Sequence, residues 1–131
     1  MPAYDGTQFE PPAPLARVIL RNPVTGATRS DVPMLLDSGA DVSLVPQSVA
    51  GLLGAAAIPD RRYELIGFDG STSFAPVVRL ELVFSRRMFR GQFLLVDQEW
   101  GILGRNVLNE VPLLFDGPHL TWDEHRRESA R

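Results

Sequence analysis

Short runs of apolar and β-branched residues recur along this chain from residue 17 onward, and turn-forming residues separate each run from the next. Residues 17–21 and 32–36 flank one such turn, which contains asparagine, proline and glycine. Residues 77–84 alternate between apolar and polar side chains, as in a strand with one buried face. Strands of this kind, joined by tight turns, predict an all-β fold, and we expect a closed barrel.

Two segments depart from the strand pattern. Pro46 precedes residues 47–54, and its fixed φ suits the first turn of a helix that would end at Gly54. Residues 107–111 are long enough for little more than one helical turn. The barrel is therefore expected to carry one or two short helices.

The length of the chain allows one domain with its own core. It has 131 residues, of which 44% are hydrophobic and 22% charged, as in ordinary globular proteins. Four prolines in the first 15 residues remove backbone donors and disfavour regular pairing. We expect a flexible proline-rich arm over residues 1–15, the folded domain over 16–123, and a polar C-terminal tail over 124–131.

Charge and cysteine content exclude several classes of function. The 13 basic and 16 acidic residues give a net charge of −3 with no run of one sign, so neither nucleic acid nor a membrane surface is an expected partner. Without cysteine there is no disulfide or thiolate chemistry, and His119 and His125 do not form a metal-binding pair. No metal or cofactor is expected. The absence of a long apolar run or a signal pattern predicts a cytoplasmic protein.

The strand at residues 32–36 delivers Asp37 into a turn made by Ser38 and Gly39. Because the end of an apolar strand is buried, the carboxylate of Asp37 lies at the edge of an apolar environment and not in free solvent. Two such carboxylates facing each other share one proton and titrate as a pair. The ionised member can take a proton from a water that attacks a peptide carbonyl, while the protonated member hydrogen-bonds the carbonyl oxygen.

A surface turn is the competing interpretation of the same residues, because aspartate, serine and glycine are all turn formers. The apolar runs on both sides of the turn and two further motifs downstream favour the catalytic interpretation. The chain holds no second apolar-Asp-[Ser/Thr]-Gly element. A second carboxylate must then come from another copy of the chain, which predicts a homodimer.

Two motifs resemble those of the retropepsin-like aspartic proteases. Residues 35–41, Leu-Leu-Asp-Ser-Gly-Ala-Asp, resemble that family's active-site loop, and residues 102–106, Ile-Leu-Gly-Arg-Asn, resemble its apolar-apolar-Gly-Arg-[Asn/Asp] motif. Between them, residues 63–74 resemble the flap hairpin. The resemblance covers about residues 17–123 and implies a closed acid-protease β-barrel, active as a homodimer on a polypeptide substrate.

The resemblance also implies roles for individual residues. The catalytic group is Asp37, with Ser38 tying the two loops together and Gly39 allowing the close turn. The remaining roles are substrate binding, by Ala40, Asp41, Gly67, Phe68, Asp69 and Gly70, and structural support of the site, by Gly104, Arg105 and Asn106. Asp41 is expected to pair with Arg105, and Asn106 to cap the following helical turn. Ala40 supplies no hydroxyl to the dyad, which predicts a mildly acidic pH optimum.

Three alternatives stay open from the sequence. The same barrel could serve as a non-catalytic dimerisation or peptide-binding module, because a fold and a motif do not guarantee turnover. The chain could be one domain of a larger protein. The pair expected between Asp41 and Arg105 could be a stabilising ion pair with no role in substrate binding.

Overall fold

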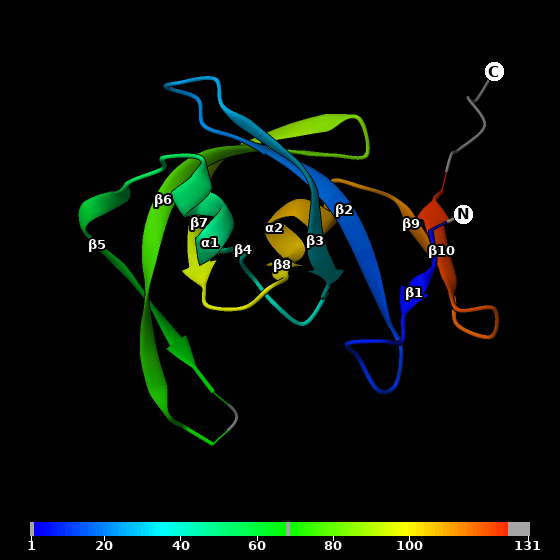
Figure 1. Cartoon of the computed structure of the whole chain (residues 1–131). Coiled ribbons are helices and arrows are strands. Elements are labelled where there is room, and N and C mark those ends of the chain that lie inside the picture. The colour runs from blue at the N-terminus through cyan, green and yellow to red at the C-terminus, as the bar shows by residue number, and fades with distance from the viewer. Residues whose placement is uncertain (1, 68, 126–131) are drawn as a thin grey trace.

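The computed structural model describes residues 2–67 and 69–125, and these residues form a β-barrel with two short helices (Figure 1). The elements in chain order are β1 (Tyr4–Asp5), β2 (Ala13–Arg21), β3 (Thr28–Leu36), β4 (Leu44–Pro46), α1 (Gln47–Leu52), β5 (Ala57–Ile66), β6 (Thr72–Phe84), β7 (Arg87–Val96), β8 (Gly101–Leu103), α2 (Arg105–Leu108), β9 (Leu113–Asp116) and β10 (Thr121–Glu124).

The barrel is closed by a pairing between two strands that are far apart in the sequence. The sheet has the order β1-β2-β3-β8-β4-β7-β6-β5, and β2 pairs in addition with β6, with Leu20 opposite Leu82. This pairing closes β2, β3, β8, β4, β7 and β6 into a ring, which leaves β5 as an outer strand. The predicted all-β, closed barrel with short helices is confirmed.

The strands bury one face, as their alternating sequences require. In β6, Val78, Leu80 and Leu82 are fully buried in the barrel core. Glu81 lies between Leu80 and Leu82 and is also buried, where its carboxylate pairs with Arg21 and with Arg90. A buried carboxylate is tolerated at this position because two guanidinium groups neutralise it.

Both helices occur close to their predicted positions. Helix α1 follows Pro46 as expected, whereas α2 begins at Arg105, two residues before the predicted turn. Neither helix of the described part of the chain is long and apolar enough to cross a membrane.

The N-terminal segment differs from the expected flexible arm. Within residues 2–15, Tyr4 and Asp5 form β1, which pairs with β2 at Pro14 and Ala13. Pro14 is accommodated because the pairing of β2 with β3 starts only at Leu15, so the missing amide removes no bond from that ladder. Part of the segment is therefore regular sheet structure.

The hairpin of β9 and β10 joins the N-terminal segment. Its strands pair with Phe115 opposite Trp122, and the Tyr4 amide donates to the Leu120 carbonyl at 2.8 Å. The Trp122 amide donates to the carbonyl of Pro2 at 3.0 Å, and the Trp122 ring contacts the core. We call residues 2–5, β9 and β10 the terminal sheet. Strand β10 continues to Glu124, one residue beyond the expected domain end, and residues 126–131 of the predicted tail lie outside the described residues.

Candidate active site

The loop that carries Asp37 owes its position to a crossing of strands. Strand β8 lies between β3, to which it runs parallel, and β4, which it meets at Leu44 opposite Ile102. The chain must therefore pass from one side of β8 to the other between β3 and β4, and residues 37–43 make this crossing. We call them the Asp37 loop. The Asp37 amide donates to the Leu103 carbonyl at 3.0 Å, which fixes the start of the loop to the barrel.

A tight turn orients the carboxylate of Asp37. The Gly39 amide donates to Asp37 Oδ1 at 2.9 Å, and the Ala40 amide donates to the Asp37 carbonyl at 3.2 Å. Asp37 is half-buried, whereas Ser38 and Gly39 are exposed. A Cβ on Gly39 would lie 3.1 Å from Asp37 Oδ1, so a side chain here would crowd the carboxylate. The turn thus presents one oriented carboxylate at the surface of the barrel.

Arg105 holds the Asp37 loop from the side of α2. Its amide donates to the Ala40 carbonyl at 2.8 Å, and its Nη1 donates to the Ser38 carbonyl at 2.7 Å. The expected ion pair between Arg105 and Asp41 is not among the ion pairs of the described residues. The guanidinium is instead engaged by the backbone of Ser38, and Asp41 is exposed. Arg105 therefore supports the site through the loop backbone.

Ser43 connects the end of the Asp37 loop to α2 and was not predicted. It is buried, its Oγ accepts a hydrogen bond from the Gly104 amide at 3.0 Å, and it donates to Asn106 Oδ1 at 2.7 Å. The prediction that Asn106 caps the helix is wrong, because the N-cap residue of α2 is Gly104 and the Asn106 side chain accepts from Ser43. A single hydroxyl within the apolar run after Asp41 was the signal that could have found Ser43.

Replacing Ser43 by alanine should cost about 1–3 kcal/mol of unfolding free energy, since it leaves the Gly104 amide and the Asn106 amide oxygen without their partner. Urea titrations of the two proteins would measure the difference. Ser73→Ala, at an exposed position of β6, serves as the matched control and should stay within about 0.5 kcal/mol of the wild type. Equal unfolding free energies of Ser43→Ala and Ser73→Ala would mean that the hydrogen bonds of Ser43 make no net contribution to the stability of the fold.

The hairpin of β5 and β6 has the form predicted for a flap. Its arms pair up to Ile66 opposite Thr72, and the Gly67 amide donates to the Ser71 carbonyl at 2.9 Å. Gly70 has φ +81°, a conformation that suits glycine, and its amide donates to the Gly67 carbonyl at 3.0 Å. Phe68, one of the predicted site residues, lies outside the described residues. Figure 1 shows this hairpin tip and the connection between β3 and β4 on the same, lower side of the barrel.

Asp69 organises the hairpin tip through Ser71. Its Oδ1 accepts from the Ser71 hydroxyl at 2.6 Å and from the Ser71 amide at 2.9 Å. The hydroxyl, and next the amide, hold the pKa of the Asp69 carboxyl below its ordinary value. Because the pKa is depressed in the folded chain, this interaction is fully present above the ordinary aspartate pKa and is lost as the pH falls through the lower, folded value.

The pKa of Asp69 should rise toward the ordinary aspartate value in Ser71→Ala, because that variant loses the hydroxyl donor that contributes most to the shift. Titration of the Asp69 carboxyl carbon by NMR would measure it. Ser73→Ala removes a nearby hydroxyl that does not contact Asp69 and should leave the titration unchanged. An identical pKa of Asp69 in the wild type and in Ser71→Ala would contradict this assignment.

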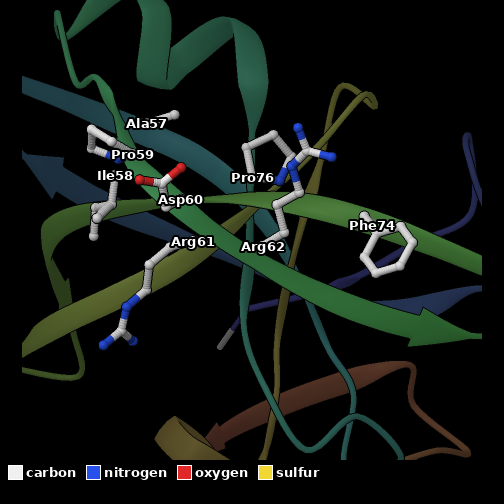
Figure 2. A pocket seen from close by; sticks show the side chains of 8 residues that line it. All are labelled: Ala57, Ile58, Pro59, Asp60, Arg61, Arg62, Phe74 and Pro76. Carbon is white, nitrogen blue, oxygen red and sulfur yellow. The ribbon is translucent and has the colours of Figure 1, made fainter.

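Two surface cavities border these elements. One of about 420 Å³ lies beside Ser38 and is also lined by Leu36, Leu113 and Phe115. Another of about 410 Å³ lies on the flap hairpin, lined by residues 57–62, Phe74 and Pro76, and Figure 2 shows the side chains of Arg61 and Arg62 pointing in different directions there. None of the described site residues lines this second cavity. Among the described residues, no group of three or more His, Asp or Glu could hold a metal ion.

Comparisons with known proteins identify the fold. Neither family models nor curated proteins give a match to the sequence. Among solved structures, the chain is similar to EIAV protease complexed with the inhibitor HBY-793, with a TM-score of 0.56 and 22% sequence identity over 75% of this chain and 86% of that one. At this identity the likeness concerns the fold, and the chain has the retropepsin-like fold that its motifs indicated.

Proposed function

We propose that this chain of retropepsin-like fold is a homodimeric aspartic endopeptidase, in which Asp37 of each subunit supplies one carboxylate of a catalytic pair. The observation that carries the proposal is the geometry of Asp37. Its carboxylate is half-buried at the end of a core strand and is oriented by the Gly39 amide at 2.9 Å. The Asp37 loop is anchored to β8 and α2 by backbone and side-chain hydrogen bonds. A rigid, oriented carboxylate at the surface is what a shared site across a two-fold axis requires.

In the proposed reaction, the ionised carboxylate of one Asp37 takes a proton from a bound water, and the water oxygen attacks the peptide carbonyl carbon. The protonated carboxyl of the partner subunit's Asp37 donates a hydrogen bond to the carbonyl oxygen and stabilises the tetrahedral intermediate. The Asp37 carboxyl that took the proton from the water then gives it to the peptide nitrogen. The carbonyl re-forms as the carbon–nitrogen bond breaks, which releases the amine and leaves that carboxylate ionised again. No covalent enzyme intermediate forms along this route.

The remaining site residues have proposed roles in binding. An extended peptide would lie between the Asp37 loop and the flap hairpin and pair with backbone groups in the manner of a strand. Asp41 is exposed, and since Arg105 binds the Ser38 carbonyl, the Asp41 carboxylate is available to backbone amides of a substrate. Gly67, Asp69 and Gly70 form the hairpin tip and would close over the bound peptide together with Phe68.

Cleavage of a diverse peptide pool, read by mass spectrometry from about pH 3 to pH 8, tests the proposal. We expect cleavage within extended peptides, with a mildly acidic optimum, by a protein that sediments as a dimer at the assay concentration. An active protein that sediments as a strict monomer would exclude the shared site. A folded dimer that cleaves nothing across this range would favour a peptide-binding or dimerisation module on the same fold.

A further inference from the structure

We infer that the open edge of β7, over residues 87–93, binds an extended acidic polypeptide segment by adding it to the sheet as a further strand. We call this surface the β7 groove. It is lined by residues 87–93 and, from the side of α2, by Asn106, Val107 and Glu110. Neither Asp37 nor the flap hairpin lines it, so the inference goes beyond the proposed function and does not depend on it.

The edge is open because β4 is short. Strand β7 pairs with β6 along one edge from Arg87 to Leu94, whereas on its other edge β4 pairs only with Leu94 to Val96. Within the described part of the chain, residues 87–93 have no strand on that second edge. A cavity of about 640 Å³ lies there. Strand β7 therefore has a strand on one side and a groove on the other.

The turn between β6 and β7 sets the hydrogen-bond pattern of this pair of strands. Its two residues, Ser85 and Arg86, both have positive φ, as in the tight turns that join paired strands. The flanking pair, Phe84 opposite Arg87, is then a hydrogen-bonded pair. From this pair onward, bonded and non-bonded pairs alternate along the ladder.

The alternation shows which residues of β7 direct their backbone groups into the groove. Met88, Arg90 and Gln92 belong to non-bonded pairs, so their amides and carbonyls point away from β6. Leu94 continues the same series, and its amide donates to the Ser43 carbonyl, just before β4, at 3.3 Å. The open edge therefore offers three donors and three acceptors to an added strand.

Arginine side chains make the outer face of this edge positive. Arg90 lies on the edge itself, and its side chain is 77% exposed although its Nε pairs with Glu81. Arg79 is exposed and faces Gln92 across the ladder, and Arg61 donates to the Gln92 side chain at 3.0 Å. Because two guanidinium groups already neutralise the Glu81 carboxylate, positive charge remains for an acidic ligand.

The inner side of the groove has room for apolar side chains. Phe89, Gly91 and Phe93 share this face of β7, and Val107 of α2 lines the same groove. A Cβ on Gly91 would have no neighbour within 4 Å, so space for a ligand side chain remains there. Since successive side chains of a strand point to opposite faces, the ligand would carry acidic and apolar residues at alternate positions.

Charge also argues against two other occupants. A second copy paired antiparallel along this edge and centred on Arg90 would place two Arg90 side chains directly opposite each other, which is unfavourable. Residues 126–131 of the chain itself contain three arginines and one glutamate, so their charge has the same sign as that of the edge. An acidic segment of another polypeptide is the occupant of complementary charge.

Fluorescence anisotropy with a labelled peptide of about seven residues, in which glutamate and leucine alternate and both ends are blocked, tests the inference. We expect saturable binding to the wild type and to Asp37→Asn, and recovery of the intact peptide from Asp37→Asn. A peptide with lysine in place of glutamate should bind at least about tenfold more weakly. Equal affinity for the two peptides, or no saturable binding of the glutamate peptide, would overturn the inference.

Two variants at position 88 test the backbone bonds. Met88→Pro removes an outward amide without removing a bond to β6, whereas Met88→Ala shortens the side chain and keeps the amide. We expect the glutamate peptide to bind Met88→Pro about tenfold more weakly than Met88→Ala. Equal dissociation constants in two variants with native circular dichroism would contradict pairing along β7.

Arg90→Gln tests the charge of the edge. Glu81 keeps its pair with Arg21 in this variant, so the fold should persist. Arg29→Gln is the matched control, because Arg29 is exposed on β3, and β2 and β6 lie between β3 and β7. We expect Arg90→Gln to bind the glutamate peptide about tenfold more weakly than the wild type, and the control to bind it equally well. The same affinity in both variants would overturn the inference.

Discussion

Asp37→Asn is expected to lower kcat for peptide hydrolysis by about 10³-fold or more while the fold and the dimer persist. Asparagine has the shape of aspartate but cannot take a proton from water, so the general base and the shared proton are both lost. The change is mild structurally, because the side-chain oxygen of asparagine can still accept the hydrogen bond that the Gly39 amide gives to Asp37 Oδ1 at 2.9 Å. Peptide cleavage would measure the fall in kcat, and sedimentation of the same preparation would show whether the dimer persists.

Asp60→Asn is the matched control, with the same loss of one negative charge at an exposed position of β5. Asp60 has φ +61°, a conformation that asparagine also tolerates, so this variant should keep its activity.

Mixing the wild type with excess Asp37→Asn tests whether two chains share one active site. If each site needs two Asp37 residues, exchange of subunits should reduce wild-type activity; activity proportional to the wild-type chain alone would mean that one chain suffices.

Much of the barrel could be predicted because its strands carry their own pattern. The alternation in residues 77–84 corresponds to a strand whose Leu80 and Leu82 are fully buried, and the Asp69-Gly70 turn lies at the tip of a hairpin. The Asp37 loop could be recognised because an apolar strand, a turn and a second apolar strand follow one another directly. Each of these signals lies within a few consecutive residues, and such a pattern determines a strand or a turn without contacts from distant parts of the chain.

The contacts of the Asp37 loop could not be predicted in the same way, because they depend on β8 lying between β3 and β4. That crossing places the Arg105 guanidinium at the Ser38 carbonyl, where sequence reasoning expected it at Asp41. It also buries Ser43 between Gly104 and Asn106, which are about 60 residues away in the chain. The N-terminal pairing was missed for a related reason, since it uses β10 from the far end of the chain.

Gly104→Ala is expected to destabilise the domain by at least about 4 kcal/mol, which is a large part of the stability of a protein of this size. A Cβ on Gly104 would lie 2.2 Å from the carbonyl oxygen of Val42 and 2.9 Å from that of Ala40. Both atoms are backbone of the Asp37 loop and cannot rotate away. The conformation of Gly104 itself, φ −93° and ψ −174°, is open to alanine, so the cost arises from the close approach of the two backbones.

Gly51→Ala is the matched control, because Gly51 lies in α1 and nothing would come within 4 Å of its Cβ. Alanine there should raise the unfolding free energy by about 0.5–1 kcal/mol through its higher helix propensity. Urea denaturation followed by tryptophan fluorescence would compare both variants with the wild type. Opposite signs of the two effects would show that β8 and the Asp37 loop are held together by a contact that admits only glycine. A Gly104→Ala protein as stable as Gly51→Ala would mean that the loop can move away from β8, and the rigid placement of Asp37 on which the proposed chemistry depends would then be lost.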